Sequence, residues 1–250
     1  MARRRIAAAS AILGLITILQ ALGLAVFQWR DGSGIGMFFA SETIVPDWAA
    51  RVVDLAAVGI LLLSAVHALL PVGPILLMTS GFLIMLEPVL AAASSGAMMQ
   101  LMSIPAHAAR WAAPLVLGIC MSMREPLTPR TKPFLLLRYA LTATFGMLGL
   151  GIIFQRPPLV AQWVELFAHW IEQPRYVNEM ILGLGGVTVL AAALIAMGRS
   201  MFGVAVCGLW GIALTATHVS GVSLATAGEV MARAPEWGLP IVAWLVWRRR

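Results

Sequence analysis

The chain has 250 residues, of which 60% are apolar and only 11% are charged. Because a soluble domain carries roughly 25% charged residues, this composition excludes a water-covered globular protein and indicates a polytopic membrane protein. In a membrane protein the net charge of +6 does not indicate nucleic-acid binding. The distribution of the basic residues along the chain instead indicates which loops lie in the cytoplasm. Cys120 and Cys207 both lie inside apolar runs without CxxC spacing, which excludes a disulfide framework.

The first apolar stretch runs from Ile6 to Trp29 and follows three arginines. A signal peptide has an apolar core of only about 7–15 residues, so this longer stretch predicts an uncleaved first transmembrane helix. A membrane span needs about 20 largely apolar residues. By this criterion we predict eight spans, at residues 6–28, 52–70, 72–93, 107–123, 134–154, 177–197, 201–222 and 237–247.

The segment between the fourth and fifth spans, residues 124–133, is rich in proline and charge and predicts a cytoplasmic linker. It separates two four-span halves, residues 1–123 and 134–250. An even number of spans places both termini on the same side of the membrane. With the termini inside, 11 of the 17 basic residues and only one of the 11 acidic residues are cytoplasmic, which follows the positive-inside rule. We therefore expect a multi-pass protein of a bacterial cytoplasmic (inner) membrane with both termini cytoplasmic.

Two similar phrases occur 126 residues apart, RWAAPLVLGICMSMR from residue 110 and EWGLPIVAWLVWRRR from residue 236. They place Trp111 opposite Trp237 and Pro114 opposite Pro240, near the start of the last span of each half. Four spans per half is an even number, so the halves insert in the same orientation. The predicted fold class is an all-α membrane protein with eight transmembrane helices in two parallel four-helix repeats. The alternative is a chance likeness between two apolar segments.

The longer outer loops predict interfacial helices. In PPLVAQWVELFAHWIEQ, the polar residues Gln162, Glu165, His169 and Glu172 recur at steps of three and four, which places them along one helix face. Tryptophans on the other side suit the headgroup region of the membrane. The corresponding loop of the first half, IGMFFASETIVPDW, is expected to contain a shorter helix of this kind.

Two spans of the second half resemble those of DoxX-like integral membrane proteins. KPFLLLRYALTATFGMLGLGIIF is similar to the opening helix of that family, with Arg138 near its inner end, and NEMILGLGGVTVLAAALIAMGR is similar to the second helix, with Glu179 before a glycine-rich run. The resemblance covers residues 133–250 better than residues 1–124. It implies a four-helix unit, here doubled, and membership of a redox complex, since some members are linked to quinone-dependent sulfur oxidation. In the first half Asp54 stands roughly where Glu179 does, and no arginine holds the place of Arg138.

Glu87 is the most unusual residue within a predicted span, because it lies roughly 9 Å below the outer end of the third span. A carboxylate at that depth costs several kcal/mol unless it is paired or protonated. One hypothesis makes Glu87 a proton-handling group or the partner of a quinone or a cation, with His218, His107 and Glu179 around it. The other makes it a neutral side chain that is hydrogen-bonded to a neighbouring helix beside Pro88.

The second helix of each half begins near an acid, which complements the positive end of a helix. For Glu179 we expect Arg175 or Arg138 as a partner. We assign structural or interface roles to Arg138 and to the recurring residues Trp111, Pro114, Trp237 and Pro240.

The sequence disfavours haem and metal sites. Haem needs two axial histidines at matching depth, and only His218 lies well inside a predicted span. Copper(I) would suit Met98, Met99 and Met102, and His169 would be a metal candidate in the predicted outer loop at residues 155–176. However, the chain contains 14 methionines, and methionine commonly fills gaps in apolar packing. We therefore assign neither a metal site nor a catalytic residue.

These observations leave three classes of function. The first is a DoxX-like membrane subunit of a redox or energy-conserving complex, offering a quinone or lipid pocket near the outer leaflet or a docking surface for periplasmic subunits. The second is a transporter of a small solute or a metal ion, with its site between the two repeats. The third is a scaffold without a ligand. All three predict membrane lipids as partners and favour a non-catalytic subunit over a stand-alone enzyme.

Overall fold

The computed structural model describes residues 2–32, 38, 46–69, 74–95, 103–123, 132–154, 160, 164, 171, 173–198, 200–216 and 224–248. Within these ranges the regular structure is helical and contains no strand, which confirms the all-α prediction. The helices, in chain order, are α1 (Ala2–Asp31), α3 (Asp47–Leu69), α4 (Pro74–Ser95), α5 (Ser103–Ala106), α6 (Ala108–Ser122), α7 (Lys132–Ile153), α9 (Pro174–Met197), α10 (Met201–Ala216), α11 (Leu224–Ala232) and α12 (Ala234–Trp247).

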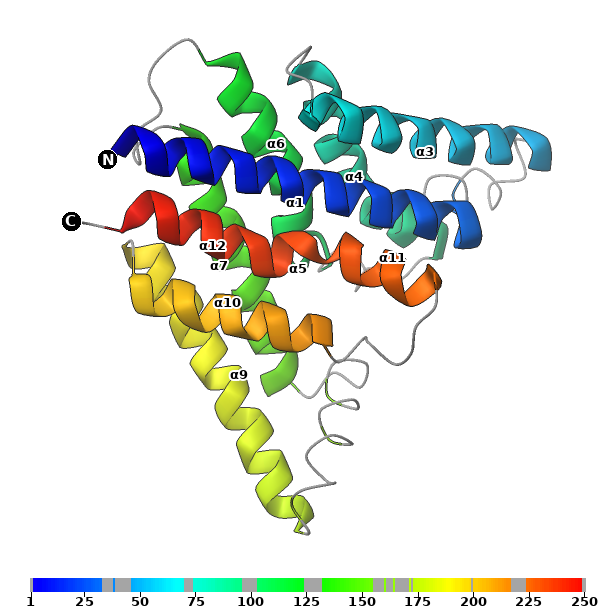
Figure 1. Cartoon of the computed structure of the whole chain (residues 1–250). Coiled ribbons are helices and arrows are strands. Elements are labelled where there is room, and N and C mark those ends of the chain that lie inside the picture. Colours follow the sequence, from blue (N-terminus) through cyan, green and yellow to red (C-terminus); the bar gives the residue numbers. More distant parts are fainter. Residues whose placement is uncertain are drawn as a thin grey trace.

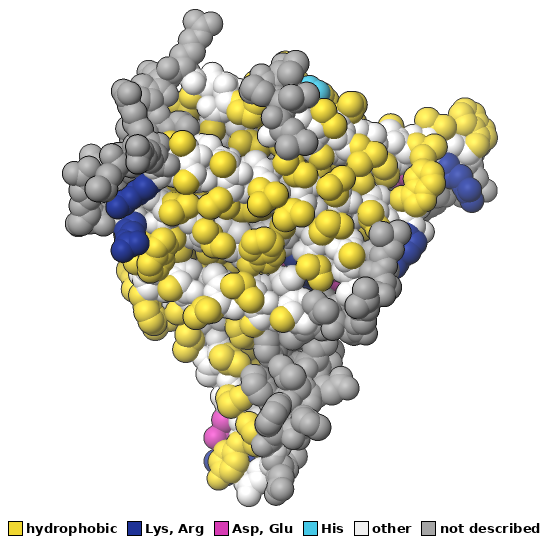
Figure 2. All heavy atoms as spheres, viewed as in Figure 1, with side chains coloured by type: hydrophobic (Ala, Val, Ile, Leu, Met, Phe, Trp, Pro, Cys, Tyr) yellow, Lys and Arg dark blue, Asp and Glu magenta, His cyan; other side chains and the backbone are white. Residues whose placement is uncertain are grey.

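Among the described residues, four helices are long and apolar enough to cross a membrane. Their candidate spans, in α1, α3, α7 and α9, are Arg5–Arg30, Trp48–Ala68, Lys132–Ile153 and Arg175–Met197. Hydrophobic side chains are also spread across the described part of the face shown in Figure 2, with basic side chains mainly towards its edges. Several long apolar helices fit a multi-pass membrane protein.

The other predicted spans correspond to shorter apolar helices. α6 has 15 residues and α12 has 14, and at 1.5 Å per residue they extend about 21–23 Å, less than the roughly 30 Å of a hydrocarbon core. The apolar part of α4, Pro74–Leu90, and α10 are short as well. Among the described residues four helices are therefore candidate spans, and the predicted eight crossings are not confirmed.

The last predicted span of each half is preceded by an interruption between two helices. α5 and α6 are separated at His107, and α11 and α12 are separated at Arg233. In the second half, Pro235 lacks an N–H group and its ring would clash with the carbonyl group one turn earlier, so the helix cannot continue. The equivalent residue of the first half, 126 positions before Pro235, is Ala109. Alanine has an N–H group, and this group donates to Thr144 Oγ1 of α7 at 2.8 Å.

The helices of the two halves are interleaved (Figure 1). α1 packs against α3, α11 and α12, while α7 packs against α9, α5 and α6. The first helix of each half thus contacts the closing helices of the other half. Arg5 Nη1 donates to the carbonyl oxygen of Arg248 at 3.2 Å, so the two ends of the chain lie together at one end of the molecule (Figure 1).

Glycines allow the closest helix contacts. A Cβ atom on Gly23 of α1 would lie 2.3 Å from the backbone nitrogen of Ala232, and a Cβ atom on Gly211 of α10 would lie 2.4 Å from the carbonyl oxygen of Glu236. Within a bilayer, where lipid competes for apolar contacts, close backbone packing of this kind is a main source of helix association. It brings α11 and the start of α12 against α1 and α10.

Candidate functional site

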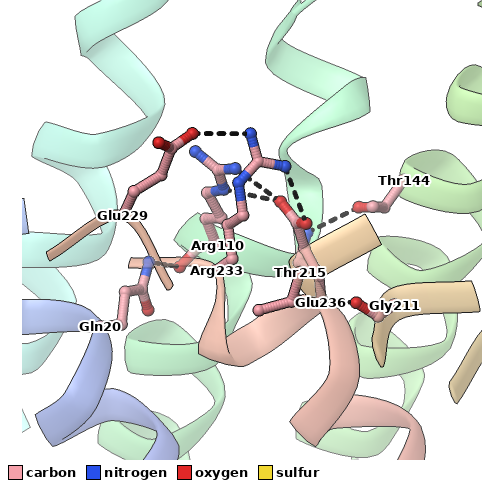
Figure 3. A network of polar contacts seen from close by, with 9 residues as sticks. Gln20, Arg110, Thr144, Gly211, Thr215, Glu229, Arg233 and Glu236 are labelled. Carbon is pink, nitrogen blue, oxygen red and sulfur yellow. Dashed lines mark hydrogen bonds and ion pairs between the residues drawn. The ribbon is translucent and has the colours of Figure 1, made fainter. Parts of the chain in front are cut away.

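A buried ion pair joins the first turns of α6 and α12. Arg110 donates to Glu236 Oε1 from both Nε, at 2.9 Å, and Nη2, at 2.6 Å (Figure 3). The two side chains are only 16% and 3% exposed. Charges removed from water are tolerated when they are paired with good geometry, and removal of either partner is strongly destabilising. The contact therefore fixes the two helix starts relative to each other.

Two further charged side chains extend this pair. Arg233 Nη1 lies 3.6 Å from Glu236 Oε2, and Arg233 Nη2 donates to Glu229 Oε1 at 3.3 Å (Figure 3). Arg233, Glu236, Arg110 and Glu229 form a charge cluster of two cations and two anions. Arg233 precedes the predicted span at 237–247. Burial lowers the pKa of its guanidinium, while the neighbouring Glu236 carboxylate partly offsets this by raising the pKa.

Neighbouring helices hold the charge cluster in place. Gln20 of α1 donates from Nε2 to the carbonyl oxygen of Arg110 at 2.7 Å, and Thr144 of α7 accepts from the N–H of Ala109. Glu236 lies in the first turn of α12, where its negative charge complements the positive helix end. The start of α6 is thereby bonded to both α1 and α7 (Figure 3).

A cavity of about 400 Å³ lies beside the charge cluster. We call it the junction cavity, because helices of both halves line it. Its volume falls within the range of small-molecule sites, about 300–1,000 Å³. The apolar part of its lining consists of Leu24, Phe27, Ile84, Pro88, Ile104, Trp111 and Ala232, and the polar part of Glu87, His107, Arg110, Glu229 and Arg233.

Two polar atoms of the cavity-lining residues have unused hydrogen-bonding capacity. His107 Nδ1 and Arg233 Nε are buried and have no hydrogen-bond partner among the described residues. Buried polar atoms are normally satisfied by protein, water or ligand. Trp111, by contrast, donates from Nε1 to the carbonyl oxygen of Ile104 at 3.1 Å, which fixes its ring in the cavity wall.

The structure brings together two of the four residues predicted to surround a ligand. Glu87 and His107 both line the junction cavity. Glu179 does not, since it lies on α9 with 54% of its side chain exposed and pairs with Arg175 at 2.8 Å, one of its two expected partners. His218 lies outside the described residues, as do the weak metal candidates His169, Met98, Met99 and Met102.

The residues expected to have structural roles all lie at helix contacts. Arg138 donates from Nη2 to the carbonyl oxygen of Ala196, which connects α7 to the C-terminal end of α9. Pro114 and Pro240 are buried inside α6 and α12. Trp237 is partly buried against the main apolar core, and Trp111 lines the junction cavity.

The charge cluster was not anticipated, although the repeated phrases contained a signal for it. RWAAPLV and EWGLPIV begin with opposite charges, Arg110 and Glu236, at equivalent positions 126 residues apart. His107 and Arg233, which directly precede α6 and α12, have the same offset. Opposite charges at equivalent positions of two packed repeats would have predicted an ion pair between them.

Within the described ranges, no three His, Cys, Asp or Glu side chains lie close enough together to hold a metal ion. Comparisons of the chain with protein-family models, with curated proteins and with solved structures give no match.

Proposed function

We propose that the protein is a membrane subunit that binds a quinone, or a similarly amphipathic lipid-like molecule, in the junction cavity. The observation that carries this proposal is the division of the cavity lining into an apolar part and a polar part. Sites for small molecules typically combine apolar walls with a few convergent polar groups. A quinone has matching parts, an apolar ring with a tail and two carbonyl oxygens that accept hydrogen bonds.

Each part of the lining has a chemical role in this proposal. Phe27 and Ile84 contact the ring and the tail, while His107 and the two arginines supply donors towards the carbonyl oxygens. Glu87 is the group that exchanges a proton with the bound molecule, as intramembrane carboxylates do in proton relays. Electrons come from partner subunits, in keeping with the resemblance of the second half to DoxX-like proteins.

We also propose the finer membrane topology, with eight crossings in two parallel repeats and both termini in the cytoplasm of a bacterial cell. Three observations support it. The helices preceded by His107 and Arg233 begin 126 residues apart, the packing of α1 corresponds to that of α7, and the two ends of the chain lie together.

Quinone binding can be measured by calorimetric titration of the purified protein in lipid nanodiscs with decylubiquinone. Ile84→Trp fills the junction cavity and should weaken binding by about tenfold or more. Leu209→Trp, at a 70% exposed position of α10, is the matched control. Glu87→Gln should change the pH dependence of binding, and the exposed Glu179→Gln should not. Equal affinity in Ile84→Trp and the wild type would overturn the proposal.

A transporter is the second candidate, favoured by one specific observation. Both halves line the cavity, and the two interrupted helices meet there through His107 and Arg233. Discontinuous helices around a site between repeats are a common transporter plan. Single cysteines at Phe27 and Ile104 can be labelled from either side of sealed vesicles. Access that alternates between the two sides supports transport, whereas one-sided access supports the binding subunit.

A further inference from the structure

A second hollow region lies on the side of α1 that faces α3. It consists of two adjoining cavities of about 530 and 490 Å³ that share Trp29, Arg30 and Val58. We call the whole region the α1–α3 groove. The first cavity is otherwise lined only by apolar side chains, Leu22, Ala25, Val26, Leu62 and Met231. The second is polar over about half of its lining and adds Gln28, Gly32, Arg51, Asp54 and Leu55.

The polar end of the groove is built by the termination of α1. Gly32 has a φ of +82°, a left-handed conformation that ends helices and that glycine adopts without strain. Its N–H donates to the carbonyl oxygen of Gln28 at 2.9 Å. A Cβ atom at Gly32 would lie 3.6 Å from Asp54 Oδ2, so the last turn of α1 is held close to the first turns of α3.

The groups at this end are complementary to both charges of a zwitterion. Arg30 and Arg51 are exposed cations, and arginine binds phosphate oxygens through its planar guanidinium. Asp54 supplies a negative charge in the same cavity. Gln28 is only 6% exposed, and its Oε1 accepts no hydrogen bond from any described residue, so this buried acceptor lacks a donor.

Apolar and polar groups follow one another along the groove in the same order as the acyl chain and the headgroup of a phospholipid. Trp29 is 71% exposed where the apolar and polar cavities meet, and exposed tryptophans favour the membrane–water interface. On one side of it lie Val26 and Leu62, and on the other side lie the charged groups of the polar cavity. An acyl chain and a headgroup would meet these two environments in the same order.

We infer that the α1–α3 groove binds a phospholipid with a primary ammonium headgroup, of the phosphatidylethanolamine type. The phosphate lies against Arg51 and Arg30, the ammonium group donates to Gln28 Oε1 and faces Asp54, and one acyl chain follows the apolar cavity. A choline headgroup has no N–H to donate. The groove shares no lining residue with the junction cavity, so this inference is independent of the proposed function.

The test is native mass spectrometry of the full-length protein after delipidation, titrated with phosphatidylethanolamine, phosphatidylcholine or phosphatidylglycerol of identical chains. Phosphatidylethanolamine should bind at least about tenfold more tightly than phosphatidylcholine, the factor expected from one hydrogen bond to a charged group. Arg51→Gln should weaken the binding of all three lipids. Gln28→Leu should remove the preference for ethanolamine over choline.

Matched controls separate this groove from general lipid contact. Arg175→Gln, at a side chain that is 85% exposed on α9, and Leu209→Trp on α10 should bind lipid as the wild type does, whereas Leu62→Trp should fill the apolar cavity and reduce binding. Equal binding of the ethanolamine and choline lipids, or tighter binding of phosphatidylglycerol, would overturn the ammonium assignment. Unchanged binding in both Arg51→Gln and Leu62→Trp would overturn the site.

Discussion

Replacement of Glu236 by leucine tests whether the charge cluster stabilises the contact between α6 and α12. The carboxylate is the acceptor of both described Arg110 side-chain hydrogen bonds, and the two side chains are 16% and 3% exposed. Breaking such a pair leaves a buried charge and costs about 3–5 kcal/mol. Arg110→Met should be less damaging, because Glu236 keeps Arg233 at 3.6 Å.

The double variant Arg110→Met/Glu236→Leu distinguishes a paired charge from simple packing. It removes both charges, and well-packed apolar replacements of a buried ion pair are often neutral or stabilising. Its free energy of unfolding should therefore lie closer to the wild type than that of Glu236→Leu alone, a clear departure from additivity.

The assay is reversible unfolding in mixed detergent micelles, followed by circular dichroism and tryptophan fluorescence. Glu179→Leu is the control, since its ion pair with Arg175 is exposed and such pairs contribute about 0–1 kcal/mol. A loss below about 1 kcal/mol for Glu236→Leu, or strictly additive losses in the double variant, would refute the reasoning.

Two further substitutions probe the helix contacts around the site. Gly23→Ala forces a methyl group into the backbone of α11 and should cost about 1–3 kcal/mol, whereas Gly59→Ala on α3, with nothing within 4 Å, should stabilise by up to about 1 kcal/mol; equal effects in the same unfolding assay would contradict the close packing. Thr144→Val removes the acceptor of the Ala109 N–H and should cost about 1 kcal/mol. Thr79→Val, whose hydroxyl among the described residues donates to Ile75 of its own helix, should cost less, and hydrogen exchange at Ala109 should accelerate only in Thr144→Val.

Much of the helical framework could be predicted from hydropathy and the repeated phrases. The predicted span at 107–123 became α6, Ala108–Ser122. The span at 237–247 became α12, which begins three residues earlier at Ala234, because Pro235 is well suited to the first turn of a helix. Hydrophobic periodicity does not reveal the interruptions at His107 and Arg233. The interruption at Arg233 depends on the missing N–H of Pro235, and the one at His107 depends on the hydrogen bond from Ala109 to Thr144 of another helix.

For the candidate site, the sequence points to Glu87, because a carboxylate within an apolar run needs a partner, and groups His107 with it as a proton or quinone candidate. Both residues line the junction cavity. The sequence does not point to Arg110 and Glu236 as a pair, because the predicted topology places each of them near the outer membrane surface. Their pairing depends on the packing of α6 and α12, which the apolar pattern of either helix alone does not specify.

The most direct test of a ligand in the junction cavity is photocrosslinking with an azido-quinone in native membranes, with the labelled residues mapped by mass spectrometry. If a quinone binds there, cavity-lining residues such as Phe27, Ile104 and Trp111 should be labelled, and excess unlabelled decylubiquinone or Ile84→Trp should suppress this labelling. Labelling confined to exposed positions such as Leu209, or labelling that excess quinone does not reduce, would contradict it.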